Sequence, residues 1–204
     1  MGSNIPMKKL LTLLLLTLLP LLAVAQNTAG WGRGSARQTP IPLSKNQKLV
    51  KTSTDVVLVA LPVAALTGVL INKDWEGLKQ GCFTAVATVG ATYILKAAVH
   101  EQRPDLSTWD SFPSGHASIT FATAGFLQRR YGWKFGVPAY VLSTYVAWGR
   151  CFARRHNVWD VIAGAALGST AAYLFTTPWA RNHDLSVAPV ATDTHLGLSA
   201  SLSF

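Results

Sequence analysis

Five apolar stretches, separated by shorter polar segments, dominate the hydropathy pattern of the chain. They cover residues 55–71, 82–99, 114–127, 135–148 and 159–175. Each is long enough for a helix, and none shows the strict alternation of apolar and polar residues that is typical of a strand. The second and the fifth are rich in Gly and Ala, which let helices pack closely within a bilayer. The pattern therefore predicts an all-α fold, a multi-helix transmembrane bundle.

The polar segments between these stretches divide between the two ends of the predicted bundle. Each crossing reverses the side, so the loop at 100–112, the start of the third helix and the stretch 150–160 fall at one end. The basic turn at 128–134 falls at the other end, which the positive-inside rule assigns to the cytoplasm. Five crossings then place the first end in the periplasm. The third helix is the weakest spanning candidate, because Ser118, Thr120 and Thr123 make it polar.

The N-terminal 25 residues have the pattern of an export signal. A short basic region at 7–9 precedes a leucine-rich core at 10–22, and an Ala-x-Ala cleavage site ends at Ala25. We favour cleavage, with an uncleaved first membrane helix as the alternative. The predicted organisation is therefore a signal peptide or first helix at 1–25, an extended polar periplasmic segment at 26–51, a helical domain at 52–178 and a tail at 179–204.

The tail follows a different pattern from the rest of the chain. Its apolar residues alternate with small or polar ones, which is the period of a strand; they are Leu196, Leu198, Ala200, Leu202 and Phe204. The ending resembles the last strand of an outer-membrane barrel, but one strand cannot close a barrel. A flexible tail is the favoured interpretation.

The composition favours a membrane protein that meets anions. Only 13% of the 204 residues are charged, against about 25% in soluble domains, and the net charge is +9. Basic runs with interleaved aromatic residues and zinc-ligand spacings are both missing from the sequence, so no nucleic-acid partner is expected. Cys82 and Cys151 lie near opposite ends of the apolar stretches, so no disulfide between them is predicted.

The stretch 150–160 carries the first candidate chemistry. His156 and Asp160 are four residues apart, a spacing that places two residues on one face of a helix. The carboxylate can then accept the Nδ1–H of the imidazole, which leaves Nε2 free as a nucleophile or base. Arg150 adds a planar cation suited to phosphate. The combination indicates a nucleophilic histidine facing an anion; the alternative is a basic loop beside a membrane helix.

Two further clusters fall at the same predicted end. Lys96 and Arg103 are two helical turns apart, so both can point the same way. A lysine within an apolar helix is a functional candidate, unless it snorkels to the interface. Ser114, Gly115 and His116 open the third helix, where N–H groups and a hydroxyl can bind an anion and the imidazole can donate a proton. The alternative is an N-capping serine with an incidental histidine.

In this order and spacing, the three clusters resemble the signature of the type 2 phosphatidic acid phosphatase superfamily, which includes bacterial acid phosphatases and vanadium haloperoxidases. The motifs are Lys-x6-Arg-Pro from Lys96, Pro-Ser-Gly-His ending at His116, and Arg-x5-His-x3-Asp ending at Asp160. The resemblance covers residues 96–160 in motif and 55–175 in helix pattern. One position departs from it: the superfamily usually has Ser where this chain has Gly149, which puts one phosphate hydrogen bond in doubt.

The resemblance implies the helical bundle of that superfamily and a role for each matched residue. His156 would attack phosphorus and form a phosphohistidine, Asp160 would orient it, and His116 would protonate the leaving alkoxide. The phosphate would be held by Lys96, Arg103, Ser114, Gly115 and Arg150. Cationic side chains can stabilise the charge that a metal stabilises elsewhere, so no metal and no cofactor is expected. The residues His100, Arg154 and Arg155 lie outside the matched positions and are assigned to the rim or to contact with the substrate headgroup.

The predicted function is metal-independent hydrolysis of a lipid phosphate monoester or diphosphate at the periplasmic face of the bacterial envelope. Candidate substrates are phosphatidic acid, phosphatidylglycerol phosphate, an isoprenyl diphosphate and a lipid A phosphate. The expected partners are the membrane and the lipid phosphate, with no obligate protein partner. A soluble periplasmic acid phosphatase and a non-enzymatic membrane protein are the alternatives.

Overall fold

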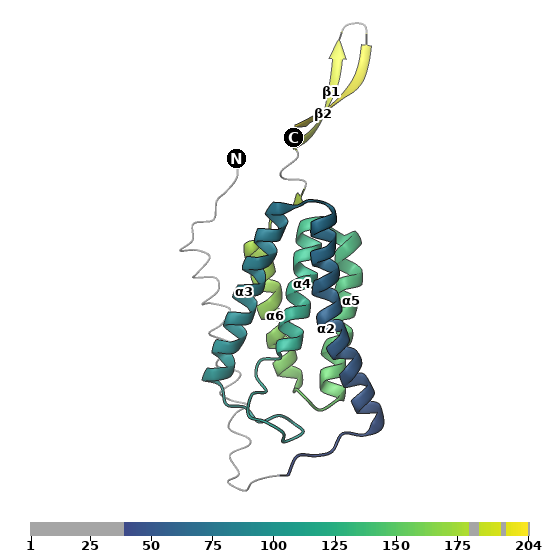
Figure 1. The fold of residues 1–204 in the computed structure, drawn as a ribbon. Helices are drawn as coiled ribbons and strands as arrows, with labels where there is room; N and C mark the ends of the chain where they lie inside the picture. Colours follow the sequence, from purple (N-terminus) through teal and green to yellow (C-terminus); the bar gives the residue numbers. More distant parts are fainter. Residues whose placement is uncertain (1–38, 180–183, 193–194, 204) are drawn as a thin grey trace.

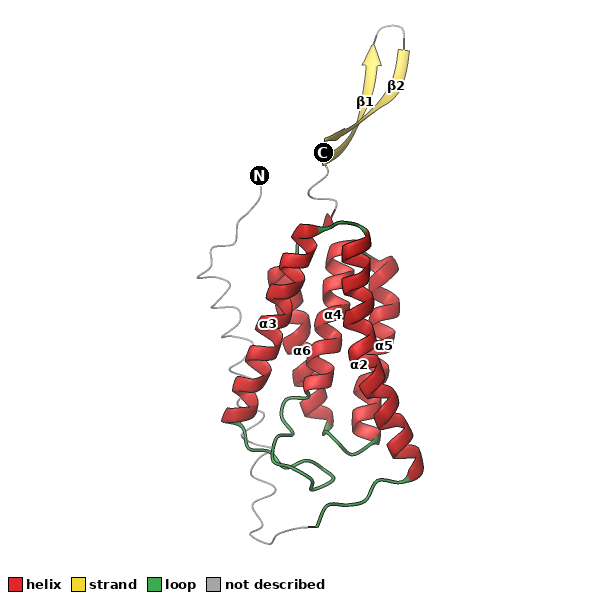
Figure 2. Cartoon of the chain, viewed as in Figure 1, coloured by secondary structure: helices red, strands yellow, loops and turns green. Residues whose placement is uncertain are grey.

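The computed structural model describes residues 39–179, 184–192 and 195–203, and five helices within them form an up-and-down bundle (Figure 1, Figure 2). These helices are α2 (Lys45–Ile71), α3 (Trp75–Ala98), α4 (Gly115–Tyr131), α5 (Trp133–Phe152) and α6 (Val158–Phe175). The prediction of an all-helical bundle is confirmed for residues 45–175. The predicted export signal at 1–25 lies outside the described residues.

The helix α2 begins well before the apolar stretch that predicted it. Ser44 and Gln47 form a capping box, in which Ser44 N donates to Gln47 Oε1 at 2.9 Å and Gln47 N donates to Ser44 Oγ at 3.3 Å. The cap starts a helix whose first turns are polar and therefore show no apolar period. The expectation of an extended segment through residue 51 is wrong for residues 45–51.

The polar helix α4 lies at the centre of the bundle and packs against α2, α3, α5 and α6. Its hydroxyl groups are satisfied within the helix: Ser118 Oγ donates to Ser114 O at 3.0 Å and Thr120 Oγ1 donates to His116 O at 2.8 Å. Both side chains are fully buried. Protein therefore surrounds the helix that is least suited to contact lipid.

Glycines on α6 allow an unusually close contact with α4. A Cβ at Gly164 would lie 2.5 Å from Ser114 O, and a Cβ at Gly168 would overlap Ser118 O. Two glycines four residues apart form a shallow groove along α6 that receives the backbone of α4. The N-terminal ends of the two helices are thereby fixed beside each other.

Three of the described helices, α2, α3 and α6, are long and apolar enough to cross a membrane, judged by length and composition. The outward faces of the first two expose large apolar side chains, among them Val59 at 62%, Val86 at 73% and Ile94 at 70%. Apolar surface of this extent indicates contact with lipid, and the chain is an integral membrane protein. Neither α4 nor α5 meets the same measure, so the expectation of five crossings depends for these two helices on packing.

A buried ion pair closes the end of the bundle opposite the long loop at 99–114. Arg130 donates to Asp74 through Nε at 2.7 Å and through Nη2 at 2.5 Å, and Tyr131 OH donates to Asp74 at 2.8 Å. Arg130 Nη1 also donates to Thr177 O at 3.1 Å. The prediction of a basic turn at 128–134 is wrong in this respect, because α4 continues to Tyr131 and Arg130 is buried.

The tail forms an antiparallel hairpin of β1 (Asp184–Thr192) and β2 (His195–Ser203), in which Asp184 is opposite Ser203. The strand period noted near the end of the chain corresponds to β2, and the favoured interpretation as a flexible tail is wrong. The strand β1 escaped prediction because its apolar alternation ends at Pro189 and Val190.

We predict that Gly168→Ala destabilises the protein by about 1–3 kcal/mol, because the added methyl group must push α4 away from α6. The thermal midpoint of the detergent-solubilised protein should then fall by roughly 2–10 °C. Gly90→Ala is the matched control, since nothing lies within 4 Å of a Cβ at that position. An equal effect of both substitutions would contradict the close contact.

Candidate active site

The three predicted clusters meet at the end of the bundle that carries the long loop at 99–114 (Figure 1). The up-and-down order places the C-terminal ends of α3 and α5 beside the N-terminal ends of α4 and α6. The predicted site residues lie on these ends or on the adjoining loops: Lys96, Arg103, Ser114, Gly115, His116, Arg150, His156 and Asp160. Arg150 belongs to the last turn of α5, and His156 precedes α6, which begins at Val158.

His156 and Asp160 face each other at the start of α6, and both are buried. His156 Nδ1 lies 3.5 Å from Asp160 Oδ2, which is longer than an ordinary N–H···O hydrogen bond. That oxygen instead accepts hydrogen bonds from Ser111 Oγ at 2.5 Å and Asn157 N at 2.8 Å. Within the described residues, neither His156 Nδ1 nor Asp160 Oδ1 has a hydrogen-bond partner. His156 and Asp160 therefore face each other as predicted, and their long separation is common for catalytic groups in proteins without bound substrate.

The surroundings of His156 favour the neutral form of its imidazole. Burial lowers its pKa to about 4; Asp160 opposes this shift, while Arg150 and Arg103 reinforce it. A neutral imidazole retains the lone pair that a nucleophile requires.

Lys96 and Arg103 converge on one loop residue, Asp110. Arg103 donates to both carboxylate oxygens of Asp110 at 3.0 Å, and Lys96 Nζ donates to its backbone carbonyl at 2.5 Å. Burial raises the pKa of Asp110, but hydrogen bonds from Thr108 and Arg103 outweigh it and hold the pKa well below its ordinary value. Arg103 is therefore held in place by an ionised carboxylate, and Lys96 by the backbone carbonyl of the same residue.

Arg150 and His116 converge on an acidic residue that sequence reasoning missed. Asp55 Oδ1 lies 2.7 Å from His116 Nε2 and accepts from Arg150 Nη1 at 2.9 Å, while Asp55 Oδ2 accepts from Lys51 Nζ at 2.7 Å. Asp55 belongs to α2, which contributes no motif. One signal was available: an acidic residue at the edge of an apolar membrane helix is a functional candidate.

Ser114 and Gly115, at the start of α4, differ in their contacts. The Ser114 hydroxyl caps α4 by accepting from Ala117 N at 3.5 Å, and its backbone N donates to Asp160 O at 2.9 Å. Its capping role corresponds to the alternative considered for this serine. A Cβ at Gly115 would meet only Thr92 Cγ2, at 3.8 Å, so packing does not require a glycine there.

Gly149 faces α2 and not the cluster of cations. A Cβ there would lie 2.5 Å from Thr54 Cγ2 and 3.0 Å from Val50 Cγ1. The space that a serine side chain would need at this position is occupied by the buried Thr54. The glycine at position 149, where the motif usually has serine, therefore allows α2 to approach α5 closely.

Arg155, assigned to the rim from the sequence, instead anchors the long loop. Its Nη1 donates to Asp105 Oδ2 at 2.7 Å and to Ser107 Oγ at 3.3 Å. A second bond runs from Asn157 Nδ2 to Glu101 Oε1 at 3.0 Å. Together these bonds hold the loop at 99–114 against the segment that carries His156.

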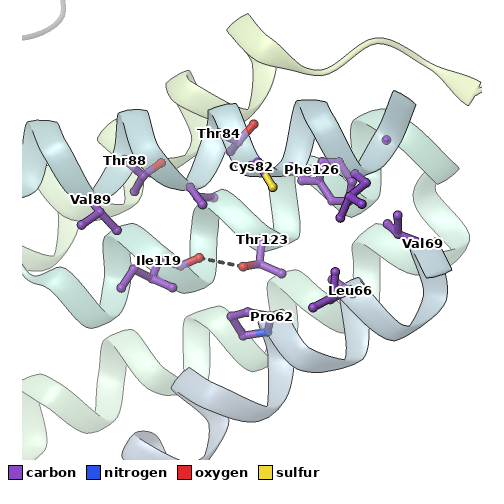
Figure 3. Close-up of a pocket in the computed structure, with 16 residues that line it drawn as sticks. Pro62, Leu66, Val69, Cys82, Thr84, Thr88, Val89, Ile119, Thr123 and Phe126 are labelled. Atoms are coloured by element: carbon purple, nitrogen blue, oxygen red, sulfur yellow. Dashed lines mark hydrogen bonds between the residues drawn. The ribbon is translucent and has the colours of Figure 1, made fainter. Parts of the chain in front are cut away.

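An apolar cavity of about 260 Å³ lies between α2, α3 and α4 (Figure 3), and it extends from the middle of the bundle to Val69 and Gly77, near the Asp74 end. Pro62, Leu66, Val89, Ile119 and Phe126 are among the side chains that line it. It contains none of the predicted site residues. Thr88, on its wall, is eight residues before Lys96 on α3, which corresponds to roughly 12 Å along a helix.

The polar cluster has the composition for phosphoryl transfer. It combines a neutral imidazole, a second histidine and several cations in a largely buried setting, where positioning and charge stabilisation are most effective. No group of three or more His, Cys, Asp or Glu residues suited to a metal ion occurs in the described part of the chain.

The PAP2 superfamily model matches residues 78–184 of the chain. A lipid A 4'-phosphatase of Helicobacter pylori (strain J99) is 32% identical over 147 residues, which cover 67% of this chain and 74% of that protein. A lipid A 1-phosphatase of the same strain is 26% identical over 151 residues, covering 70% of this chain and 75% of that protein.

Two solved structures are similar in fold. LpxE of Aquifex aeolicus matches with a TM-score of 0.57 and 17% identity, over 76% of this chain and 92% of that one. The transmembrane PAP2-type phosphatidylglycerolphosphate phosphatase of Bacillus subtilis matches with a TM-score of 0.53 and 19% identity, over 82% of this chain and 92% of that one.

We predict that the His156 imidazole stays neutral down to about pH 5, because burial disfavours its charged form. An ordinary histidine with a pKa near 6.5 would be largely protonated at that pH. Titration of ¹⁵N-histidine-labelled protein by NMR checks this, with His156→Ala identifying the signal. A midpoint near 6.5 for that signal would contradict the buried, neutral imidazole.

Proposed function

Since the chain belongs to the PAP2 superfamily, and its relatives described above are lipid phosphatases, we propose that it is a hydrolase that removes phosphate from lipid A. The two relatives from Helicobacter pylori are named as phosphatases of lipid A, one at the 4' and one at the 1 position. A lipid A 1-phosphatase of Porphyromonas gingivalis is 35% identical, but over only 101 residues, whereas the match to the 4'-phosphatase is 32% over 147 residues. We therefore propose the 4'-phosphate as the first candidate, on the greater length of that match, and the 1-phosphate as the second. The resemblance to the superfamily noted in the sequence is confirmed by the family match.

The observation that carries the proposal is the convergence of three distant motifs at one end of a membrane bundle. His156 and Asp160 lie at the start of α6, and the backbone N of Ser114 bonds to Asp160 O at 2.9 Å. The second histidine, His116, is the second residue of α4. Such a site can act on a phosphate group at the end of the bundle while the lipid stays in the membrane.

In the proposed mechanism, the lone pair of His156 Nε2 attacks phosphorus and the bond to the leaving oxygen breaks. Asp160 stabilises the positive charge that develops on the imidazole. His116 gives a proton to the leaving oxygen, so the lipid departs as an alcohol. Water then attacks the phosphohistidine, transfers a proton to His116 and releases phosphate, which restores both histidines.

The cations would stabilise the charge on the three equatorial phosphoryl oxygens in the transition state. Lys96, Arg103 and Arg150 carry this charge in the proposal. Gly115 would let the phosphate approach the N-terminus of α4, since packing does not require a glycine there. These assignments need no metal ion.

The apolar cavity between α2, α3 and α4 suits a hydrocarbon chain of the substrate (Figure 3). Its lining residues nearest in sequence to the proposed site are Val89, seven residues before Lys96 on α3, and Ile119, three residues after His116 on α4. A soluble acid phosphatase would have no use for three helices apolar enough to span a bilayer, so the structure favours a lipid substrate over a soluble one.

The direct test is phosphate release by the purified protein in EDTA, with lipid A phosphorylated at 1, at 4' or at both positions, beside phosphatidic acid and phosphatidylglycerol phosphate. We predict the fastest turnover on lipid A that carries the 4'-phosphate. Turnover confined to the other lipids would contradict the proposed substrate, and turnover that needs added Mg²⁺ or Zn²⁺ would contradict the metal-independent mechanism.

We predict that His156→Ala abolishes turnover, because it removes the nucleophile. Asp160→Asn should lower kcat by about 10²–10⁴-fold, since it no longer stabilises the charged imidazole. Wild-type protein quenched in alkaline denaturant during turnover of ³²P-labelled lipid should carry label on histidine, because a phosphohistidine is stable in base. Full activity of His156→Ala would overturn the mechanism.

The proposed site faces the periplasm. At the site end, Arg103, Arg150 and Arg155 are each paired with an acid, but Lys45, Lys48 and Arg154 are exposed there. The opposite end exposes Lys73, Lys79 and Lys134, so exposed positive charge does not distinguish the two ends. The proposed orientation rests on the export signal and the five crossings expected from the sequence.

We predict that a cysteine at His100 reacts with a membrane-impermeant thiol reagent in spheroplasts, whereas a cysteine at Lys134 reacts only after lysis. Both positions are exposed and lie at opposite ends of the bundle. The background is Cys82→Ser, Cys151→Ser, because both native cysteines are free. The reverse labelling pattern would place the site in the cytoplasm.

A further inference from the structure

We propose that Asp55 is a positioning residue of the active site, which holds His116 as the acid that protonates the leaving oxygen. This inference rests on the proposed phosphatase function and adds a residue outside the three motifs. It starts from one contact: Asp55 Oδ1 lies 2.7 Å from His116 Nε2. The same oxygen accepts from Arg150 Nη1 at 2.9 Å.

The position of Asp55 follows from the contact between α2 and α5. Thr54, the preceding residue, is fully buried, and its methyl group packs against Gly149. Any side chain at position 149 would overlap Thr54. That contact brings the next residue on α2 to Arg150, which follows Gly149 on α5. Lys51, one turn earlier on α2, holds the other oxygen of Asp55 at 2.7 Å. The carboxylate is therefore fixed from both sides.

The charges around His116 explain what this carboxylate does. Burial is the largest influence on His116, and together with Arg150 from α5 and His156 from the segment before α6 it disfavours a positive charge there; Asp55 from α2 opposes this without outweighing it. A bound phosphate would add negative charge beside the imidazole and favour the protonated form together with Asp55. An acid catalyst must carry its proton when the substrate is bound. The Asp55 carboxylate stabilises the imidazolium of His116 beside a fixed guanidinium, and it engages Nε2, so that Nδ1 is the nitrogen left to give its proton.

The proton transfer balances with the proposed mechanism. As His156 attacks phosphorus, the electron pair of the breaking P–O bond goes to the leaving oxygen, which takes the proton of His116 Nδ1 and departs as an alcohol. His116 becomes neutral and remains hydrogen-bonded to Asp55. The attacking water then returns a proton to Nδ1 as phosphate forms.

The test compares two phosphomonoesters with the same hydrocarbon chain, one an alkyl ester and the other a nitrophenyl ester. An alkoxide needs a proton to leave, whereas a nitrophenolate leaves without one. We predict that Asp55→Asn lowers kcat/KM for the alkyl ester by about 10²-fold, the usual contribution of general acid catalysis, and lowers it for the nitrophenyl ester by less than about threefold. The quantity kcat/KM is used because it includes the departure of the leaving group.

The controls separate positioning from structure. Ser53→Ala, on the same helix, should leave the ratio of the two rates unchanged, because Ser53 contacts Tyr145 and not the site. In a His116→Asn background, Asp55→Asn should add no further loss on the alkyl ester, since Asp55 acts through His116. If Asp55→Asn fails to purify as a folded protein, the same ratio is measured for Asp55→Glu, which keeps the charge and should show a smaller selective loss.

Equal losses on both esters in the folded variants would overturn the inference and give Asp55 a structural role. A gain of activity or tighter vanadate inhibition in Asp55→Asn would also overturn it, by showing that the carboxylate competes with the phosphate for Arg150. A wild-type protein inactive on both esters and on every lipid phosphate would instead overturn the proposed function, and this inference with it.

Discussion

The backbone contact between α4 and α6 is the constraint on which the rest of the site depends. Gly164 and Gly168 bring the two helices together over two turns, and at the end of that contact Ser114 N donates to Asp160 O at 2.9 Å. This bond joins the second motif to the third. Because α4 also touches α2, α3 and α5, every other element is placed relative to the same helix.

The site end of the bundle gathers positive charge that would repel itself if it were unpaired. The structure pairs three guanidinium groups with one carboxylate each: Arg103 with Asp110, Arg150 with Asp55 and Arg155 with Asp105. These acids hold the donors in place before substrate arrives, so little reorganisation is needed when it binds. A phosphate group must then replace these carboxylates as the partner of the same donors. A phosphate monoester with two negative charges competes for them better than a diester with one.

The parts of the fold and site that follow from local sequence could be predicted. Apolar stretches located the helices, and the spacing from Lys96 to Asp160 located the three clusters at one end. The start of α2 could not be found in this way, because the polar residues after Ser44 are helical through capping and not through an apolar period. Asp55 is 61 residues from His116 and 95 from Arg150, so its partners depend on the packing of α2 against α5.

The same residue types serve a different purpose at the two ends of the bundle, and their hydrogen bonds show the difference. The buried pair of Asp74 and Arg130 is closed by Tyr131 and the carbonyl of Thr177, in keeping with the rule that buried polar groups are satisfied. Within the described chain, the buried side-chain atoms without a partner are all elsewhere: Arg150 Nε, Arg155 Nε, His156 Nδ1, Asp160 Oδ1 and the hydroxyls of Thr88 and Thr92. Four of these six belong to the segment 150–160. Unsatisfied donors and acceptors are costly in a buried setting, and they persist where a ligand completes the network. The satisfied network at the Asp74 end is that of a structural ion pair, and the unsatisfied groups at the His156 end support the proposed anion site.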